Sequence, residues 1–244
     1  MKNRILLIIS IFWLAVAYWM SLPDENIRIV FCDVGEGDGA IVMRGTFQML
    51  IDVGPDNGKM QRCLGRYIPF WDREIEVVVI SHNDKDHTGG LEGVRKRYDV
   101  QKVYSGELRQ NDVIRYGQIE FEILSPEKLT GNDNDDSVVG LLKYKDKRML
   151  FLGDVSMEID QRLVWRGVIR QDHGGGGIDI LKVSHHGSET GTSRELIEMV
   201  GPRLAVISVG KNNSYGHPNK ELLERLRGIE VRRTDEEGDI VVGW

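Results

Sequence analysis

Residues 81–87 read Ser-His-Asn-Asp-Lys-Asp-His and follow directly on the apolar run Val-Val-Val-Ile at residues 77–80. The apolar run predicts a buried strand, whose end delivers the following side chains to one edge of a sheet. Four of these side chains are of kinds that bind metal ions: His82, Asp84, Asp86 and His87. Imidazole suits zinc, iron and manganese, and carboxylate suits harder cations. A single His-Asp pair is usually part of a solvated loop, but four such residues followed by Thr-Gly-Gly indicate a metal site.

Three later apolar runs are followed by residues of similar kinds. These residues are Asp154 after residues 149–152, His185 and His186 after residues 180–183, and Lys211, Tyr215 and His217 after residues 205–208. Five of the six histidines lie behind one of the four runs, and only His173 lies elsewhere. Histidines scattered through a core would not collect in this way. The pattern therefore predicts a metal centre assembled from several strand ends.

The composition favours one globular domain with a sizeable core. The chain has 244 residues, 41% of them hydrophobic, which is enough for a single α/β unit. Its formal net charge of -6 excludes the global basic excess of a constitutive nucleic-acid-binding protein. The two cysteines, Cys32 and Cys63, match no zinc or redox spacing. The sequence leaves open whether they form a disulfide.

The first residues have the pattern of an export signal or a membrane anchor. Lys2 and Arg4 precede an apolar stretch at residues 5–20, and residues 23–26 read as a short polar linker. We therefore expect a signal or anchor at residues 1–22, contact with the membrane through residues 5–20, and a domain at residues 27–244 outside the cytoplasmic membrane. Cleavage after Ala17, which would give a secreted protein, is the alternative, and a buried N-terminal helix is a third reading.

Strands and helices are interleaved along residues 27–244 without a strict βαβ alternation. The expected strands are at residues 27–33, 40–44, 48–52, 76–81, 100–104, 114–116, 119–124, 138–144, 148–152, 178–183, 204–209, 230–232 and 240–242. The expected helices are at residues 59–67, 91–97, 157–168, 193–200 and 220–226. Two sheets stacked face to face, with helices outside, satisfy this pattern. The predicted fold class is α/β.

Seven short segments in chain order carry a family resemblance. They lie at residues 31–38, 51–54, 81–90, 134–137, 152–154, 184–188 and 215–218. On these segments the chain resembles the metallo-β-lactamase superfamily, and within it the C-terminal hydrolase domain of ComEC-type DNA-uptake proteins, in a stand-alone form. The resemblance implies a four-layer αβ/βα sandwich, here after an N-terminal hydrophobic helix, with a metal site at the sheet edge.

The resemblance also implies a site for two divalent ions, zinc or manganese. His82 and Asp84 would hold one ion, Asp86 and His87 the second, and Asp154 would bridge them. His185 would complete the second position, with His186 as the alternative. Three carboxylates against two divalent ions leave about one net positive charge, which lowers the pKa of a bridging water and attracts an anionic ester.

The chain departs from the broader superfamily at two points. Asp84 replaces the usual second histidine, and no histidine lies between His87 and His173. Asn134 or Ser137 is therefore expected near the substrate, in the neighbourhood of the missing middle histidine. Among the catalytic residues, Asp86 would orient the hydroxide. His217 would stabilise the transition state or protonate the leaving group, with Tyr215 or Lys211 beside it on the substrate.

The predicted function is metal-dependent hydrolysis of phosphodiesters. Single-stranded DNA during uptake is the expected substrate, and this expectation rests on the resemblance alone. An uptake role would require a separate DNA-channel protein as partner. The alternatives are an extracellular hydrolase of another ester, such as a phosphocholine or cell-wall substrate, and a non-catalytic binding module that keeps the fold. A lactam hydrolase is disfavoured by the missing middle histidine.

Overall fold

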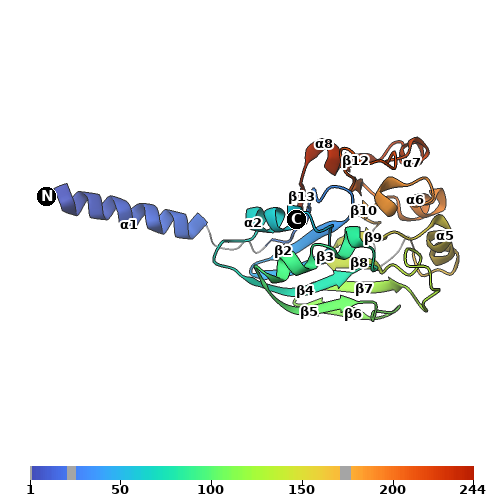
Figure 1. The fold of residues 1–244 in the computed structure, drawn as a ribbon, viewed down its shortest axis with the longest axis horizontal. Coiled ribbons are helices and arrows are strands. Elements are labelled where there is room, and N and C mark those ends of the chain that lie inside the picture. Colours follow the sequence, from blue (N-terminus) through green and yellow to red (C-terminus); the bar gives the residue numbers. More distant parts are fainter. Residues whose placement is uncertain (1, 21–25, 171–176) are drawn as a thin grey trace.

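The computed structural model describes residues 2–20, 26–170 and 177–244 (Figure 1). The helices are α1 (Lys2–Met20), α2 (Lys59–Tyr67), α3 (Lys85–Thr88), α4 (Leu91–Arg95), α5 (Met157–Trp165), α6 (Arg194–Val200), α7 (Lys220–Arg225) and α8 (Thr234–Glu237), with a 3-10 turn at His185–Gly187. The strands are β1 (Arg28–Phe31), β2 (Gly39–Arg44), β3 (Phe47–Val53), β4 (Glu74–Ile80), β5 (Asp99–Ser105), β6 (Val113–Tyr116), β7 (Ile119–Ser125), β8 (Val139–Tyr144), β9 (Lys147–Phe151), β10 (Ile180–Lys182), β11 (Leu204–Ile207), β12 (Glu230–Arg233) and β13 (Ile240–Gly243).

The strands form two mixed sheets. One has the order β13-β1-β2-β3-β4-β5 and the other β12-β11-β10-β9-β8-β7-β6. In the first sheet β3, β4 and β5 are parallel neighbours, and in the second β9, β10, β11 and β12 are. The remaining pairs are antiparallel. Since parallel strands end at the same edge, the segments that follow β9, β10 and β11 come together.

Alternation along the strands divides the core into three apolar layers. In β1, Ile29 and Phe31 pack between the two sheets, whereas Val30 packs beneath α2 and α4. In β9, Phe151 likewise points between the sheets and Leu150 packs under α5 and α6. Figure 1 shows α2 on one side of the strands and α5, α6 and α7 on the other. The predicted sandwich of two sheets between helices is therefore confirmed.

The predicted location of the protein, anchored in the cell membrane by a single spanning segment, is wrong. In the described ranges no helix combines the length and the apolar character that crossing a bilayer requires. A spanning helix needs about 20 consecutive apolar residues, and α1 begins with Lys2, Asn3 and Arg4. The helix lies apart from the two sheets in Figure 1. The boundary predicted between residues 22 and 27 falls on residues 21–25, which lie outside the described ranges.

Cys32 and Cys63 form a disulfide that joins the end of β1 to α2. The two residues are 31 positions apart, and a cross-link of that span restricts the unfolded chain by about 3–4 kcal/mol. We expect the double variant Cys32→Ala/Cys63→Ala to lose about 3 kcal/mol of unfolding free energy in urea. A reductant should lower the stability of the wild type and leave the variant unchanged. Equal stability of wild type and variant under oxidising conditions would contradict this expectation.

Asp160 on α5 is a buried carboxylate with one hydrogen-bonded oxygen. Its Oδ2 accepts the backbone N–H of Ser193 at 2.8 Å, and its Oδ1 has no partner within the described ranges. Burial raises the pKa of Asp160 from 3.8 to about 6. The folded state therefore holds the proton more tightly than the unfolded chain, and stability falls as pH rises from about 4 to about 6.

The Asp160→Asn variant removes this pH dependence. The difference in unfolding free energy between Asp160→Asn and wild type should shift in favour of the variant by about 2–3 kcal/mol between pH 4 and pH 7.5. Two pKa units correspond to that free energy. Urea unfolding at both pH values measures the difference. Glu158→Gln, an exposed carboxylate on the same helix, is the matched control and should show no such gain. A pH-independent difference between Asp160→Asn and wild type would exclude the raised pKa.

Candidate metal centre

Three imidazoles converge on one carboxylate oxygen at the edge of the two sheets. The Oδ2 atom of Asp154 lies 3.3 Å from Nε2 of His87, 3.4 Å from Nε2 of His186 and 3.9 Å from Nε2 of His82. His82 and His87 follow β4, Asp154 follows β9, and His186 follows β10. All four side chains are buried. Strand ends of both sheets thus supply one cluster, as the sequence pattern predicts.

The free atoms of this cluster fit a bound cation. Within the described residues, the Nε2 atoms of the three imidazoles and Oδ1 of Asp154 are buried without a hydrogen-bond partner. A buried polar atom without a partner is costly, and lone pairs that face a common space are what an ion would occupy. The chain therefore has candidate His/Asp metal-binding groups: His82, His87 and Asp154 form one, and Asp86, His87 and His186 form another.

The other ring nitrogen of each imidazole, Nδ1, lies within hydrogen-bond distance of an oxygen atom. His87 Nδ1 lies 2.9 Å from Oδ2 of Asp52, and His186 Nδ1 lies 3.1 Å from the carbonyl oxygen of Ser208. His82 Nδ1 lies 3.1 Å from the hydroxyl of Ser81. An acceptor at Nδ1 keeps the proton there and leaves Nε2 as the metal-facing atom.

Asp52 of β3 connects Ser81 and His87, two of the residues described above. Its carboxylate accepts the N–H and the hydroxyl of Ser81, both at 2.7 Å, as well as the imidazole of His87. Its backbone has a φ of 58°, a left-handed conformation that is uncommon for a non-glycine residue in a strand. Sequence reasoning missed Asp52 as a functional residue. A buried carboxylate at the end of an apolar strand was the available signal.

Asp84 and Asp86 stand on the open side of the cluster. Oδ2 of Asp84 lies 3.5 Å from Nε2 of His82. Oδ2 of Asp86 lies 3.3 Å from Nε2 of His186 and 3.9 Å from Nε2 of His87. Both carboxylates are more exposed than the imidazoles. They thus occupy the boundary between the buried cluster and solvent.

The electrostatics of the buried cluster favour positive charge between its members. Burial opposes protonation of His87, but the carboxylates of Asp154 and Asp52 outweigh it and raise the pKa of His87 well above its usual value. Asp154 similarly raises the pKa of His186 against the effect of burial. Burial would raise the pKa of Asp154, yet the two imidazoles lower it well below its usual value. Without a bound ion the imidazoles of His87 and His186 therefore favour their protonated forms, and a metal cation would have to displace these protons.

The turn at residues 35–39, which follows β1 of the first sheet, packs against the cluster. The N–H of Asp38 donates to the carbonyl of Asp86 at 3.2 Å. A Cβ on Gly37 would lie 2.2 Å from that same carbonyl oxygen, and Gly37 has a φ of 132°. Both the close contact and the backbone conformation therefore exclude a side chain at this position. Asp38 forms a buried ion pair with Lys182 of β10, whose Nζ lies 2.8 Å from Oδ2. Its Oδ1 lies 3.4 Å from Nδ1 of His186. Sequence reasoning also missed Lys182, which reads as one polar residue in a core strand.

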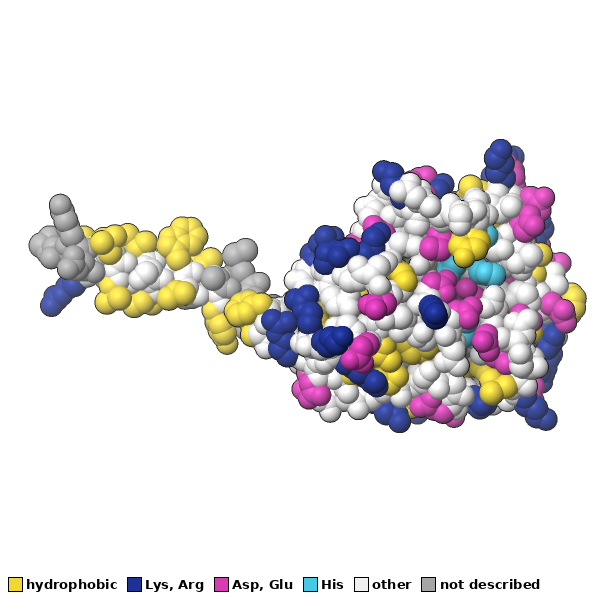
Figure 2. Space-filling view, in the orientation of Figure 1, with side chains coloured by type: hydrophobic (Ala, Val, Ile, Leu, Met, Phe, Trp, Pro, Cys, Tyr) yellow, Lys and Arg dark blue, Asp and Glu magenta, His cyan; other side chains and the backbone are white. Residues whose placement is uncertain are grey.

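A cavity of about 400 Å³ opens over the cluster. Its walls include Asp84, Asp86, Asp154 and His186, with Tyr215 and His217 from the loop after β11. Figure 2 shows His side chains beside a cluster of Asp and Glu on this face, with a hydrophobic side chain next to them. Burial and the neighbouring imidazoles of His185 and His186 lower the pKa of His217, so its ring is neutral near pH 7.

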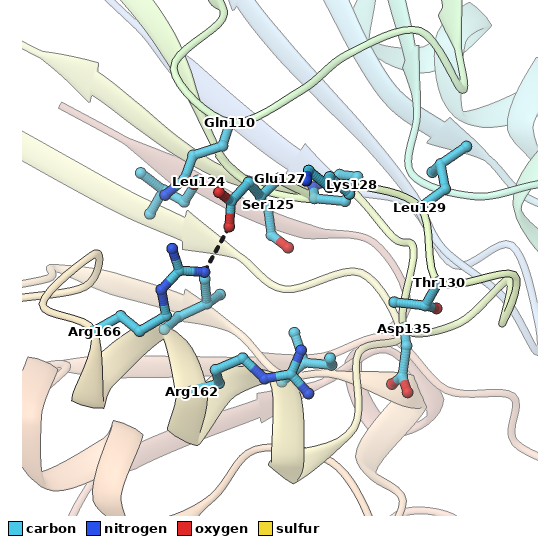
Figure 3. A pocket seen from close by; sticks show the side chains of 13 residues that line it. Gln110, Leu124, Ser125, Glu127, Lys128, Leu129, Thr130, Asp135, Arg162 and Arg166 are labelled. Atoms are coloured by element: carbon cyan, nitrogen blue, oxygen red, sulfur yellow. Dashed lines mark hydrogen bonds and ion pairs between the residues drawn. The ribbon is translucent and has the colours of Figure 1, made fainter.

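A second cavity, of about 260 Å³, lies between α5 and the loop after β7 (Figure 3). Arg166, directly after α5, donates to Glu127 of the loop at 2.7 Å across this cavity. Its other charged walls are Arg162, Lys128 and Asp135, and its floor is apolar. None of the lining residues is a histidine or one of the predicted metal ligands. We therefore place the chemistry in the first cavity.

The structure separates the predicted site residues into three groups. His82, Asp84, Asp86, His87, Asp154 and His186 come together, and Tyr215 and His217 line the same cavity. His185 lines the cavity too, but it belongs to none of the clusters of ligand atoms in the described chain. Asn134, Ser137 and Lys211 do not line it. His173 lies outside the described residues.

Ser137 has a different position from the one expected. It is fully buried, and its hydroxyl accepts the N–H of Asp154 at 3.2 Å. The carbonyl of Asn134 in turn accepts the N–H of Ser137 at 3.0 Å. A Cβ on Gly153 would lie 2.7 Å from that of Ser137, so the two segments are in close contact. Ser137 therefore helps to position Asp154, and neither Ser137 nor Asn134 lines the cavity over the cluster.

The sequence profile of the metallo-β-lactamase superfamily matches residues 39–112 and 110–211, which include every buried member of the cluster. The chain belongs to the metallo-β-lactamase superfamily. Among its curated relatives, the ComE operon protein 3 of Bacillus subtilis is 30% identical over 85% of this chain and 32% of its own length. The competence protein ComA of Neisseria gonorrhoeae is 27% identical over 91% of this chain and 33% of its own length.

A superfamily member of known structure has the same fold. The metallo-β-lactamase fold protein YhfI from Bacillus subtilis superposes with a TM-score of 0.61 at 12% identity, covering 90% of this chain and all of that one. This superfamily chain spans about a third of the length of the two curated relatives. Family membership, the cluster of ligand-type residues and the cavity together identify a hydrolase of metallo-β-lactamase fold with candidate divalent-metal sites.

Proposed function

We propose that this hydrolase binds two divalent ions and cleaves phosphodiester bonds, with single-stranded DNA as the substrate. The observation that carries the proposal is the arrangement of two half-exposed carboxylates, Asp84 and Asp86, between the imidazole cluster and the cavity. His82, Asp84 and Asp154 would hold one ion, and Asp86, His87, His186 and Asp154 the other. The ions would supply a metal-bound water of lowered pKa and a positive field for an anionic ester.

The chain's own residues would orient the reactants and donate a hydrogen bond to them. Asp86 would accept a hydrogen bond from the attacking oxygen species, because its carboxylate reaches both the cluster and the cavity. The neutral ring of His217 would donate an N–H hydrogen bond to an oxygen of the ester or the leaving group. Its buried Nδ1 has no hydrogen-bond partner within the described residues, so no neighbouring group determines which ring nitrogen carries the proton.

The choice of DNA rests on the relatives. One relative is a competence protein by name, and this chain covers about a third of it. In an uptake role the strand would be delivered by a separate channel protein. The acidic balance of the chain makes the metal centre, rather than a basic track, the main attraction for phosphate.

The full chain should be assayed with Mn²⁺ or Zn²⁺ on labelled single- and double-stranded DNA and on a chromogenic phosphodiester. We expect cleavage of single-stranded DNA that EDTA abolishes. Metal-dependent cleavage of the chromogenic diester without any cleavage of DNA would instead identify a hydrolase of another ester. Less than one ion per chain and no cleavage would identify a binding module.

Metal analysis of two adjacent variants tests the proposed ligand set. His186→Ala should lower the bound metal per chain after dialysis, because Nε2 of His186 faces Asp154 and Asp86. His185→Ala is the matched variant and should retain the wild-type metal content. The opposite result would show that His185 is the ligand.

A further inference from the structure

We propose that Tyr215 stacks on a base of the substrate strand beside the metal centre. This inference rests on the proposed function and deepens it, since it names the part of the substrate that the cavity recognises. The tyrosine ring lines the cavity over the cluster, yet it is 72% exposed. An aromatic ring that a protein leaves in solvent beside its chemistry is available for a planar ligand group.

A line of aromatic rings connects Tyr215 to the buried cluster. The Tyr215 ring lies nearly parallel to that of His217, with an interplanar angle of 16° and centroids 5.8 Å apart. The His217 ring meets His185 edge-on at 6.0 Å, and His185 meets His186 at 6.1 Å. Tyr215 is therefore the solvent end of a ladder whose other end is a proposed metal ligand. A base stacked there would lie in the cavity that Asp154 and His186 also line.

The loop that carries Tyr215 is held in shape by Asn213. The side-chain amide of Asn213 donates to the carbonyls of Gly210 and His217, both at 2.9 Å, and its oxygen accepts the N–H of His217 at 3.0 Å. The N–H of Gly210 donates to the carboxylate of Glu36 at 2.8 Å, which ties the loop to the turn after β1. Tyr215 thus stands on a braced support, and stacking would immobilise little additional chain.

The exposed ring of Tyr215 distinguishes between classes of ester substrate. Charged groups make up much of the rest of the cavity wall, including Glu36, Asp84, Lys85 and Asp86. An alkyl ester offers the ring no flat face and a choline ester offers it a cation, whereas every nucleobase has a flat face, and base–aromatic stacking tolerates any sequence. Bases in a duplex are already stacked on one another, so an open ring favours single strands.

The test compares two strands that differ only in their bases. One is an oligothymidylate, and the other is a strand of equal length made entirely of stable abasic residues. We expect the wild type to cleave the thymidylate with a kcat/KM about 5- to 150-fold higher, the range typical of one stacked base. In Tyr215→Ala this ratio should fall toward one. In Tyr215→Phe, which keeps the ring, the ratio should stay within about 2-fold of wild type.

Phe70→Ala is the matched control. Phe70 is 78% exposed, but it precedes β4, whereas His82 and His87 follow that strand at its other end. Its variant should keep the wild-type ratio. A wild-type ratio in Tyr215→Ala would overturn the inference. The ratio is the diagnostic quantity, because a structural defect lowers the cleavage of both strands alike, whereas loss of stacking lowers only the cleavage of the thymidylate.

A failure of the proposed function would look different. It would appear as no cleavage of either strand by the wild type. Binding of the two strands, measured by fluorescence anisotropy in Ca²⁺, would then decide the stacking inference. A preference for thymidylate that Tyr215→Ala removes would support it, and equal binding of both strands would overturn it.

Discussion

Replacement of Asp154 by Asn is expected to abolish metal binding and hydrolysis together. Oδ2 of Asp154 is the atom on which all three imidazoles converge, at 3.3 to 3.9 Å. Asn keeps the shape of the side chain and removes its charge. Loss of a residue that merely supports a ligand costs roughly 10- to 100-fold in metal affinity or activity. Loss of a carboxylate that would hold both proposed ions should cost more than that.

The measurements are bound metal per chain after dialysis and the rate of chromogenic phosphodiester hydrolysis. Circular dichroism should show the wild-type fold, because the N–H of Asp154 that Ser137 holds is unchanged in the variant. Asp146→Asn, an exposed carboxylate in the β8–β9 turn, is the matched control. Wild-type metal content in Asp154→Asn would show that the cluster is not the metal centre.

Replacement of Lys182 by Met is expected to destabilise the protein by about 3–5 kcal/mol. The ion pair between Lys182 and Asp38 is buried on both sides, and Lys182 holds the pKa of Asp38 low against the effect of burial. Removing one partner of a buried ion pair costs about that much, because the buried Asp38 then has only the imidazole of His186 as an ion-pair partner among the described residues. Met has similar length and no charge. Urea unfolding in metal-free buffer measures the loss.

A double-mutant cycle separates charge from packing at this pair. Lys182→Met/Asp38→Asn should recover a large part of the stability that Lys182→Met loses, because no unpaired charge remains. Lys147→Met is the control in the neighbouring strand. Its ammonium pairs with Asp146 at the surface, and such pairs contribute about 1 kcal/mol or less. Additive effects of the two buried substitutions would mean that the pair does not couple.

Most of the sandwich could be predicted because its strands repeat a simple pattern. Alternation in β1 assigns Ile29 and Phe31 to one face and Val30 to the other, and the structure buries them in different layers. The helix predicted at residues 59–67 is α2 with the same bounds. The sequence reading did not predict α3 and α8, since helices of four residues are too short to show a period.

The candidate site was only partly predictable. His185 and His186 are adjacent in a turn where both have φ near 50°, so no periodicity says which one points inward. Ser137 has the chemistry of a substrate contact, yet it lies buried against Asp154. Lys182 sits inside a strand that reads as core, and only its burial next to the cluster reveals its role.

The sequence by itself determined the composition of the centre, because ligand-type residues that follow apolar strands must emerge at sheet edges. Tertiary structure decided the rest: which imidazole joins the cluster, which nitrogen of each ring is free, and which aromatic ring stays in solvent. These properties depend on distances between segments far apart in the chain, such as that from Asp154 to His186. Such distances exist only once both sheets have packed, since local patterns specify a strand's faces but not its neighbours.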